Sequence, residues 1–151
     1  MLKHILPATL LLLAATPALA GGKMFPPTAD PVVKKECGAC HMAYQPQLLP
    51  RKSWEAMMDR LSDHFGENAS LDDKTRDAIK AYLTANAGDG GKWLRGVNTA
   101  NPPQRISEMP RFKKEHGEGK VQRMKEKSGV KTWADCVACH KQADRGYYED
   151  D

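Results

Sequence analysis

Apolar residues in the first half of the chain recur at steps of three and four residues, which is the spacing of one helix face. A first stripe predicts a helix over 53–65, with Ser53 as its N-cap and Gly66 just past its end. A second stripe predicts a helix over 70–86, opened by a segment that resembles a capping box, 70–73. The first stripe consists of Trp54, Met57, Met58, Leu61, His64 and Phe65, and the second of Leu71, Thr75, Ala78, Ile79, Tyr82 and Leu83.

Shorter helical segments are predicted on either side of these two. Asp30-Pro31 is a good helix start and predicts a helix to residue 41 or 44. Further segments are expected over 110–116, 121–127 and 133–143, and no strand pattern lies near either pair of cysteines. The irregular stretch 89–103 is rich in Gly and Pro, which favours a boundary there. We therefore expect a mainly α protein of two small helical lobes, 21–88 and 89–151.

The first twenty residues have the pattern of an export signal. Lys3 begins a short basic start, 5–15 is an apolar run, and Ala18-Leu19-Ala20 is a cleavage signal of the A-x-A type. The run is too short to span a bilayer by itself. We expect cleavage after Ala20, a mature protein that does not span the membrane, and a periplasmic location.

A five-residue motif occurs twice and uses every cysteine of the chain. It is Cys37-Gly38-Ala39-Cys40-His41 in the first half and Cys136-Val137-Ala138-Cys139-His140 in the second. C-x-x-C-H is the attachment sequence of c-type haem: the two thiols form thioethers with one porphyrin, and the histidine is the proximal ligand of the iron. The motifs therefore predict two c-type haems, each at the centre of one lobe.

Three other interpretations of the cysteines are weaker. A zinc ribbon usually separates its two pairs by roughly 15–20 residues, whereas almost the whole chain lies between these two. A thioredoxin-type redox pair is expected in a βαβ setting. Two structural disulfides fit an exported protein. None of the three explains a histidine directly after each pair.

The remaining histidines are candidates for the second axial ligands. The chain has five: His4 belongs to the signal, His41 and His140 follow the cysteines, and one is left in each half. His64 lies in an apolar stripe, where a core histidine bonded to the backbone is the ordinary alternative. His116 lies in a charged segment and could be a surface residue. Competing ligands are Met57 and Met58 for the first haem, and Met109 and Met124 for the second.

Charge is unevenly distributed along the chain. Acidic residues dominate 59–77 and basic residues dominate 105–131. Two solvated faces are the simpler interpretation; a basic docking patch for an acidic redox partner is the alternative. No basic motif interleaved with aromatic residues is present, so a nucleic-acid partner is not expected.

Together these segments resemble the small soluble dihaem cytochromes c of bacterial periplasms. The resemblance implies bis-histidine haems, with His41 and His64 on the first iron and His140 and His116 on the second; the residues alone leave a crossed pairing open. It implies an electron carrier rather than an enzyme, with a small oxygen-binding monohaem cytochrome or a membrane cytochrome b as possible partners. A haem enzyme or gas sensor with one five-coordinate iron is the rival function. The residues that carry the resemblance are 36–41, 44–46, 48–50, Ser53-Trp54, 64–69, Tyr82-Leu83, 110–112, His116 and 133–140.

Overall fold

The computed structural model describes residues 25–117 and 119–148, and this part of the chain is helical, with one isolated β-bridge between His64 and Glu67 and no strand. The mainly α fold class is therefore confirmed. The α-helices are α1 (Pro31–Cys37), α2 (Arg51–Met58), α3 (Asp73–Ala85), α4 (Pro110–Glu115) and α5 (Lys120–Ser128). The 3-10 turns are η1 (Pro46–Leu48), η2 (Leu61–Asp63), η3 (Lys92–Leu94), η4 (Ile106–Glu108), η5 (Cys136–Ala138) and η6 (Ala143–Arg145).

Helix α1 begins as predicted but ends earlier. The Asp30 carboxylate accepts hydrogen bonds from the backbone N–H groups of Val32 and Val33, at 2.8 and 3.0 Å, and Pro31 occupies the first turn. The helix stops at Cys37, so Cys40 and His41 lie in a turn beyond it. Gly38 permits this turn, since a Cβ there would lie 2.1 Å from the carbonyl oxygen of Lys34.

Helix α2 differs from the prediction at both ends. It begins at Arg51, and Ser53 lies inside its first turn, where the buried hydroxyl donates to the carbonyl oxygen of Pro103 at 2.6 Å. It ends at Met58, and η2 follows instead of two more helical turns. The carboxylate of Asp63 accepts from the N–H of Gly66 at 3.3 Å, the kind of local bond by which Asp competes with a helix. His64 is therefore a loop residue.

Two other predicted elements are also corrected. The N-cap of α3 is Asp72, which accepts from the N–H of Thr75 at 3.0 Å, rather than Ser70. The expected helix over 133–143 is absent; the second haem motif instead lies in the short turn η5, followed by η6. The hydrogen bonds there close short turns, such as Cys139 N–H to the Cys136 carbonyl at 3.2 Å.

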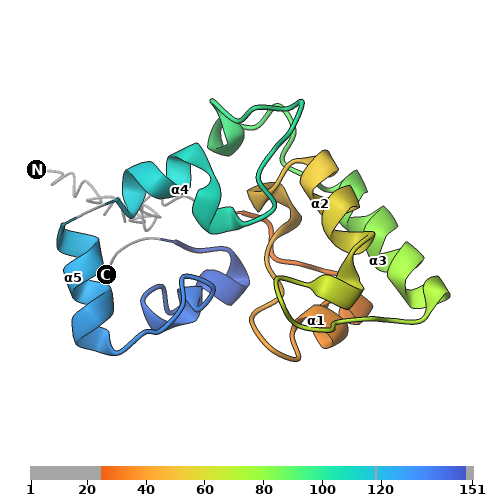
Figure 1. Cartoon of the computed structure of the whole chain (residues 1–151), viewed down its shortest axis with the longest axis horizontal. Coiled ribbons are helices and arrows are strands. Elements are labelled where there is room, and N and C mark those ends of the chain that lie inside the picture. The colour runs from red at the N-terminus through yellow and green to blue at the C-terminus, as the bar shows by residue number, and fades with distance from the viewer. Residues whose placement is uncertain (1–24, 118, 149–151) are drawn as a thin grey trace, which may run out of the picture.

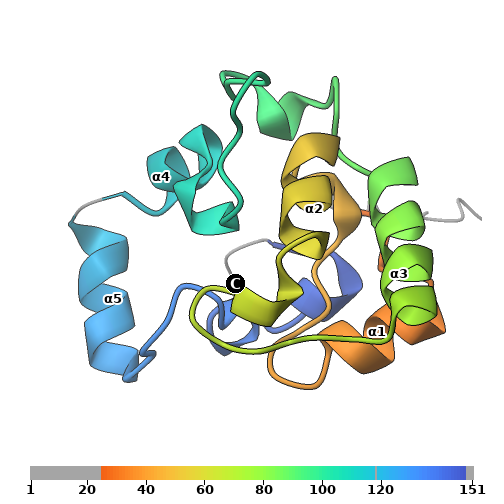
Figure 2. The same ribbon diagram turned by 45° about the vertical axis from the view of Figure 1, so that its right-hand side comes forward.

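One hydrophobic core joins the segments on both sides of residue 89. Helices α1, α2 and α3 form one end of the molecule and α4 and α5 the other, while the chain after Lys131 returns between them (Figures 1 and 2). Met109, from the second half of the chain, is fully buried in this core. Among the described residues, no helix is both long and apolar enough to cross a bilayer. The core residues are Val33, Leu49, Trp54, Met58, Ile79, Leu83, Leu94, Met109 and Phe112.

Candidate functional site

The four cysteines lie in two separate pairs and form no disulfide bond. Within 25–117 and 119–148, no three His, Cys, Asp or Glu residues come close enough together to hold a metal ion, so the donor set of a zinc ribbon is not assembled. Burial raises the pKa of the Cys37 and Cys136 thiols to about 11. A redox-active dithiol depends on a lowered thiol pKa, so the thioredoxin interpretation does not fit either pair.

The first histidine pair consists of His41 and His64. Their ring centroids are 6.2 Å apart and the ring planes differ by 26°. A tight turn holds His64 in place: its N–H donates to the Glu67 carbonyl at 2.7 Å, and the Glu67 N–H donates back at 3.2 Å. Phe65 within this turn has a φ of 57°, the left-handed region that side chains with a Cβ avoid. The turn is thus held in a costly conformation that directs the imidazole at His41.

The second pair consists of His116 and His140, with ring centroids 5.9 Å apart and ring planes at 79°. His116 is the residue directly after α4, and its ring stacks on Phe112 at 4.0 Å. Trp133 contacts both of these rings edge to face, at 5.9 Å from His116 and 5.7 Å from Phe112. His116 is therefore packed among aromatic rings, and its charged neighbours in the sequence do not place it at the open surface.

Both spacings suit two imidazoles that share one metal ion. A bond from a histidine nitrogen to a first-row metal is about 2.0–2.1 Å, and ring bonds of about 1.33 Å place the nitrogen about 1.1 Å from the ring centre. Two imidazoles on opposite sides of one metal thus have centres about 6.4 Å apart. The observed 6.2 and 5.9 Å lie close to this value. The residues therefore fit a haem iron between each pair.

The hydrogen bonds of two histidines also select the nitrogen that a metal needs. Nδ1 of His41 lies 2.7 Å from the carbonyl oxygen of Met42, and Nδ1 of His116 lies 3.2 Å from that of Phe112. A carbonyl only accepts, so both Nδ1 atoms carry the proton and Nε2 keeps its lone pair. Nδ1 of His64 is buried and has no such partner among the described residues.

His64 is kept neutral by its surroundings. Burial lowers its pKa below the ordinary value of 6.5, and the neighbouring His41 and Arg105 add to the effect. Metal ligation requires the neutral imidazole. The environment of His64 therefore favours the protonation state that binds iron.

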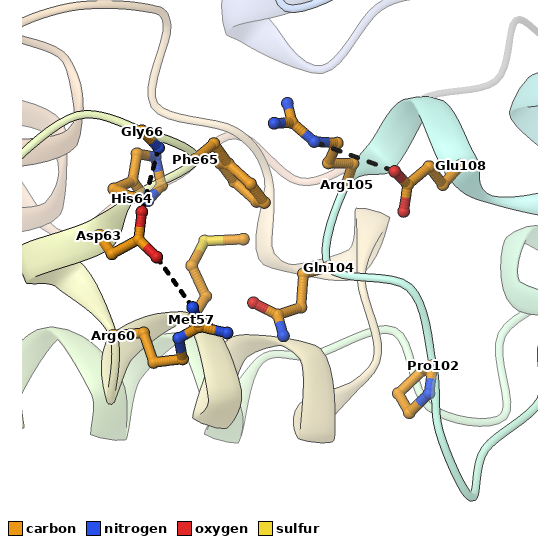
Figure 3. Close-up of a pocket in the computed structure, with 10 residues that line it drawn as sticks. All are labelled: Met57, Arg60, Asp63, His64, Phe65, Gly66, Pro102, Gln104, Arg105 and Glu108. Carbon is orange, nitrogen blue, oxygen red and sulfur yellow. Dashed lines mark hydrogen bonds and ion pairs between the residues drawn. The ribbon is translucent and has the colours of Figure 1, made fainter.

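A pocket of about 340 Å³ opens beside His64 (Figure 3). The guanidinium of Arg105 lies over the Phe65 ring, 3.9 Å from its centre, and Phe65 lies 4.9 Å from the His64 ring. Arg105 comes from the stretch after residue 89, so a cation of the second half lies near the first pair. The residues around Arg105 in the sequence do not indicate that it lies near His64. The pocket is lined by Met57, Arg60, Asp63, His64, Phe65, Gly66, Pro102, Gln104, Arg105 and Glu108.

Two tyrosines that pattern analysis did not single out as site residues also contact the histidines. Tyr44 stacks on His41 with ring centroids 4.7 Å apart, and Tyr148 lies 5.7 Å from His140. Burial raises the pKa of both phenols, so both hydroxyls remain protonated donors at neutral pH. The Tyr44 hydroxyl donates to the carbonyl oxygen of Ala134, 90 residues away in sequence, and the Tyr148 hydroxyl donates to the side chain of Gln45, 103 residues away. No local sequence pattern reveals contacts over such separations.

Comparisons with known proteins identify the family of the chain. Residues 33–148 match the family model described as dihaem cytochrome c. A structure titled diheme cytochrome c from Rhodobacter sphaeroides is 46% identical, with a TM-score of 0.74, over 82% of this chain and 99% of that one.

Two further structures are similar. A crystal structure of DHC purified from Rhodobacter sphaeroides is 45% identical, with a TM-score of 0.67, over 80% of this chain and 97% of that one. A diheme cytochrome type c from Shewanella baltica OS155 is 34% identical, with a TM-score of 0.66, over 79% of this chain and 86% of that one. Among curated proteins, none matches the chain.

Proposed function

Since the chain belongs to the dihaem cytochrome c family and carries two c-type haems, we propose that it is a periplasmic carrier of single electrons with two six-coordinate, bis-histidine irons. The observation that carries the proposal is the placement of two histidine pairs at the spacing of a shared metal ion, 6.2 and 5.9 Å between ring centroids. No catalytic residue is part of this function.

The attachment residues follow from the motifs and the two pairs. Cys37 and Cys40 would form the thioethers of the first haem, with His41 as proximal and His64 as distal ligand. The second haem would be held by four residues in the same way: Cys136, Cys139, His140 and His116. The ring distances support pairing of the two histidines within each half, and they disfavour a crossed arrangement in which a distal histidine binds the haem of the other half. We also propose that lobes 21–88 and 89–151 each hold one haem.

The haem supplies a one-electron couple, and the protein supplies its surroundings. The bonds from His41 to Met42 and from His116 to Phe112 fix the two rings and leave Nε2 for the iron. Because the pKa of His64 is lowered, a proton does not compete with the iron for its ring nitrogen. Two histidine ligands should give a lower reduction potential than a histidine–methionine pair, because methionine raises the potential.

The location and partners of the protein follow from the same assignment. The proposed export signal, residues 1–20, lies outside the described residues, and its cleavage would release the mature chain into the periplasm. Redox proteins are the partners of such a carrier. We propose a small oxygen-binding monohaem cytochrome or a membrane cytochrome b, with the basic segment 105–131 as a docking surface for an acidic partner.

A reductive titration of the purified holoprotein tests the proposed function. The two haems should take up one electron each, and the ferric protein should show only low-spin haem in its electron paramagnetic resonance spectrum. Mass spectrometry should show two haems bound covalently, and Cys139→Ala together with Cys136→Ala should remove one of them. High-spin ferric haem in the untreated protein would favour the enzyme or sensor alternative instead.

A further inference from the structure

We propose that Tyr44 is a positioning residue that fixes the first haem site against the second and thereby sets electron exchange between the two haems. The inference rests on the proposed carrier function and adds a residue to it. It starts from the segment 42–45, which follows the first haem motif and makes hydrogen bonds to the second half of the molecule. The second haem motif lies beside this segment, in the chain that returns between the two ends (Figures 1 and 2).

The side chain of Tyr44 contacts both haem sites. Its ring stacks on the proximal His41, with centroids 4.7 Å apart and planes at 21°. Its hydroxyl donates to the carbonyl oxygen of Ala134 at 2.5 Å, 90 residues further along the chain. Ala134 lies two residues before Cys136, which begins the second motif. One side chain therefore spans from the proximal ligand of the first haem to the backbone that carries the second.

The next residue makes a second connection of the same kind. Gln45 is fully buried, and its amide donates to the carbonyl oxygen of Ala143 at 2.8 Å. Its side-chain oxygen accepts from the hydroxyl of Tyr148 at 2.5 Å. The Tyr148 ring in turn lies 5.7 Å from the proximal His140. Residues 44 and 45 thus hold the second motif on both sides, before its first cysteine and after its histidine.

These bonds bear on electron transfer through distance. The exchange moves one electron from the ferrous to the ferric haem, and Tyr44 is neither oxidised nor deprotonated in it. The rate falls steeply as two redox centres separate, and the electrostatic effect of reducing one haem on the other also weakens with distance. A hydrogen bond of about 1 kcal/mol shifts an equilibrium between two arrangements about fivefold. Loss of the Tyr44 hydroxyl should therefore populate arrangements in which the two haem sites are less well fixed.

Tyr44→Phe tests this directly, because it keeps the ring on His41 and removes only the hydroxyl. Tyr82→Phe is the matched control: its hydroxyl accepts from the N–H of Ala29 at 2.9 Å, a long-range bond that does not reach the second motif. Electron exchange between the haems is measured by nuclear magnetic resonance on the half-reduced holoprotein. We expect Tyr44→Phe to slow it severalfold and Tyr82→Phe to leave it unchanged, even if both lower the melting temperature alike.

Unchanged exchange in Tyr44→Phe, or equal slowing in both variants, would overturn the proposal. Tyr148→Phe is an independent arm, since it breaks the second connection, and it too should slow exchange. Each variant is first shown to keep two low-spin haems that do not bind carbon monoxide. The same check on the unmodified protein separates the two claims. Carbon monoxide binding there would refute the proposed carrier function, whereas the comparison of the variants addresses only the role of Tyr44.

Discussion

Arg105→Gln should lower the reduction potential of the first haem and leave that of the second nearly unchanged. Ferric haem carries one more positive charge than ferrous haem, so a nearby cation favours reduction. The guanidinium of Arg105 lies beside this site through its contact with Phe65, and its charge helps to lower the pKa of His64. Removing it also leaves the carboxylate of Glu108, its partner at 3.9 Å, unopposed, which acts in the same direction.

The size of the effect follows from the distances. The guanidinium carbon lies 3.9 Å from the Phe65 centroid, and that centroid lies 4.9 Å from the His64 centroid, so Arg105 is at most 8.8 Å from the ligand ring. An iron bound to that ring lies roughly 3 Å further. At this longest separation, about 12 Å, two unit charges interact by about 1.4 kcal/mol at an effective dielectric constant of about 20 and about 0.35 kcal/mol in bulk water, and a shorter separation would increase both values.

These energies correspond to a shift of about 15–60 mV for one electron. The Arg105 side chain is 48% exposed, so the shift should shrink as salt is added. The assay is a spectroelectrochemical titration at low and high ionic strength, with the two haems distinguished by their magnetic resonance signals. Arg105→Lys is the matched control and should retain most of the potential. An equal shift in the lysine variant, a rise in potential, or a shift of the second haem alone would refute the electrostatic argument.

Three further variants test the site and the fold. His116→Ala should make the second haem high-spin and able to bind carbon monoxide, and an absorption spectrum that stays low-spin would exclude His116 as its ligand. Ser53→Ala leaves the Pro103 carbonyl without its buried donor and should lower the free energy of unfolding by about 1–3 kcal/mol in urea; an unchanged midpoint would mean that water replaces the bond. Asp30→Ala removes the cap of α1 and should cost about 1 kcal/mol, whereas Asp30→Asn should cost less because its side chain still accepts; equal losses would refute the capping argument.

Much of the site was predictable because its signals are local. The C-x-x-C-H spacing predicts the attachment cysteines and the proximal histidines without any tertiary information. The count of histidines then left His64 and His116 as candidates for the second ligands, and the structure places each beside the motif histidine of its own half. The start of α1 at Asp30-Pro31 was predictable for the same reason, since a cap is a property of neighbouring residues.

The errors arise where tertiary contacts override local pattern. The stripe over 53–65 reads as one helix, but its last residues form a turn in which Phe65 has a positive φ and His64 is directed at His41. The predicted helix over 133–143 is replaced by short turns around the second motif. Arg105 contacts Phe65, 40 residues before it in the sequence, and Tyr44 donates a hydrogen bond to Ala134, 90 residues after it. Such pairs are set by the fold, and single-sequence periodicity contains no record of them.

The absorption spectrum of the dithionite-reduced holoprotein, before and after carbon monoxide is added, tests the central claim most directly. If His64 and His116 close the two irons, the spectrum should not change, because neither iron has a site for the gas. A shift of the Soret band from one haem would show an open or easily displaced position. That result would contradict two bis-histidine haems and favour a ligand-binding or catalytic role.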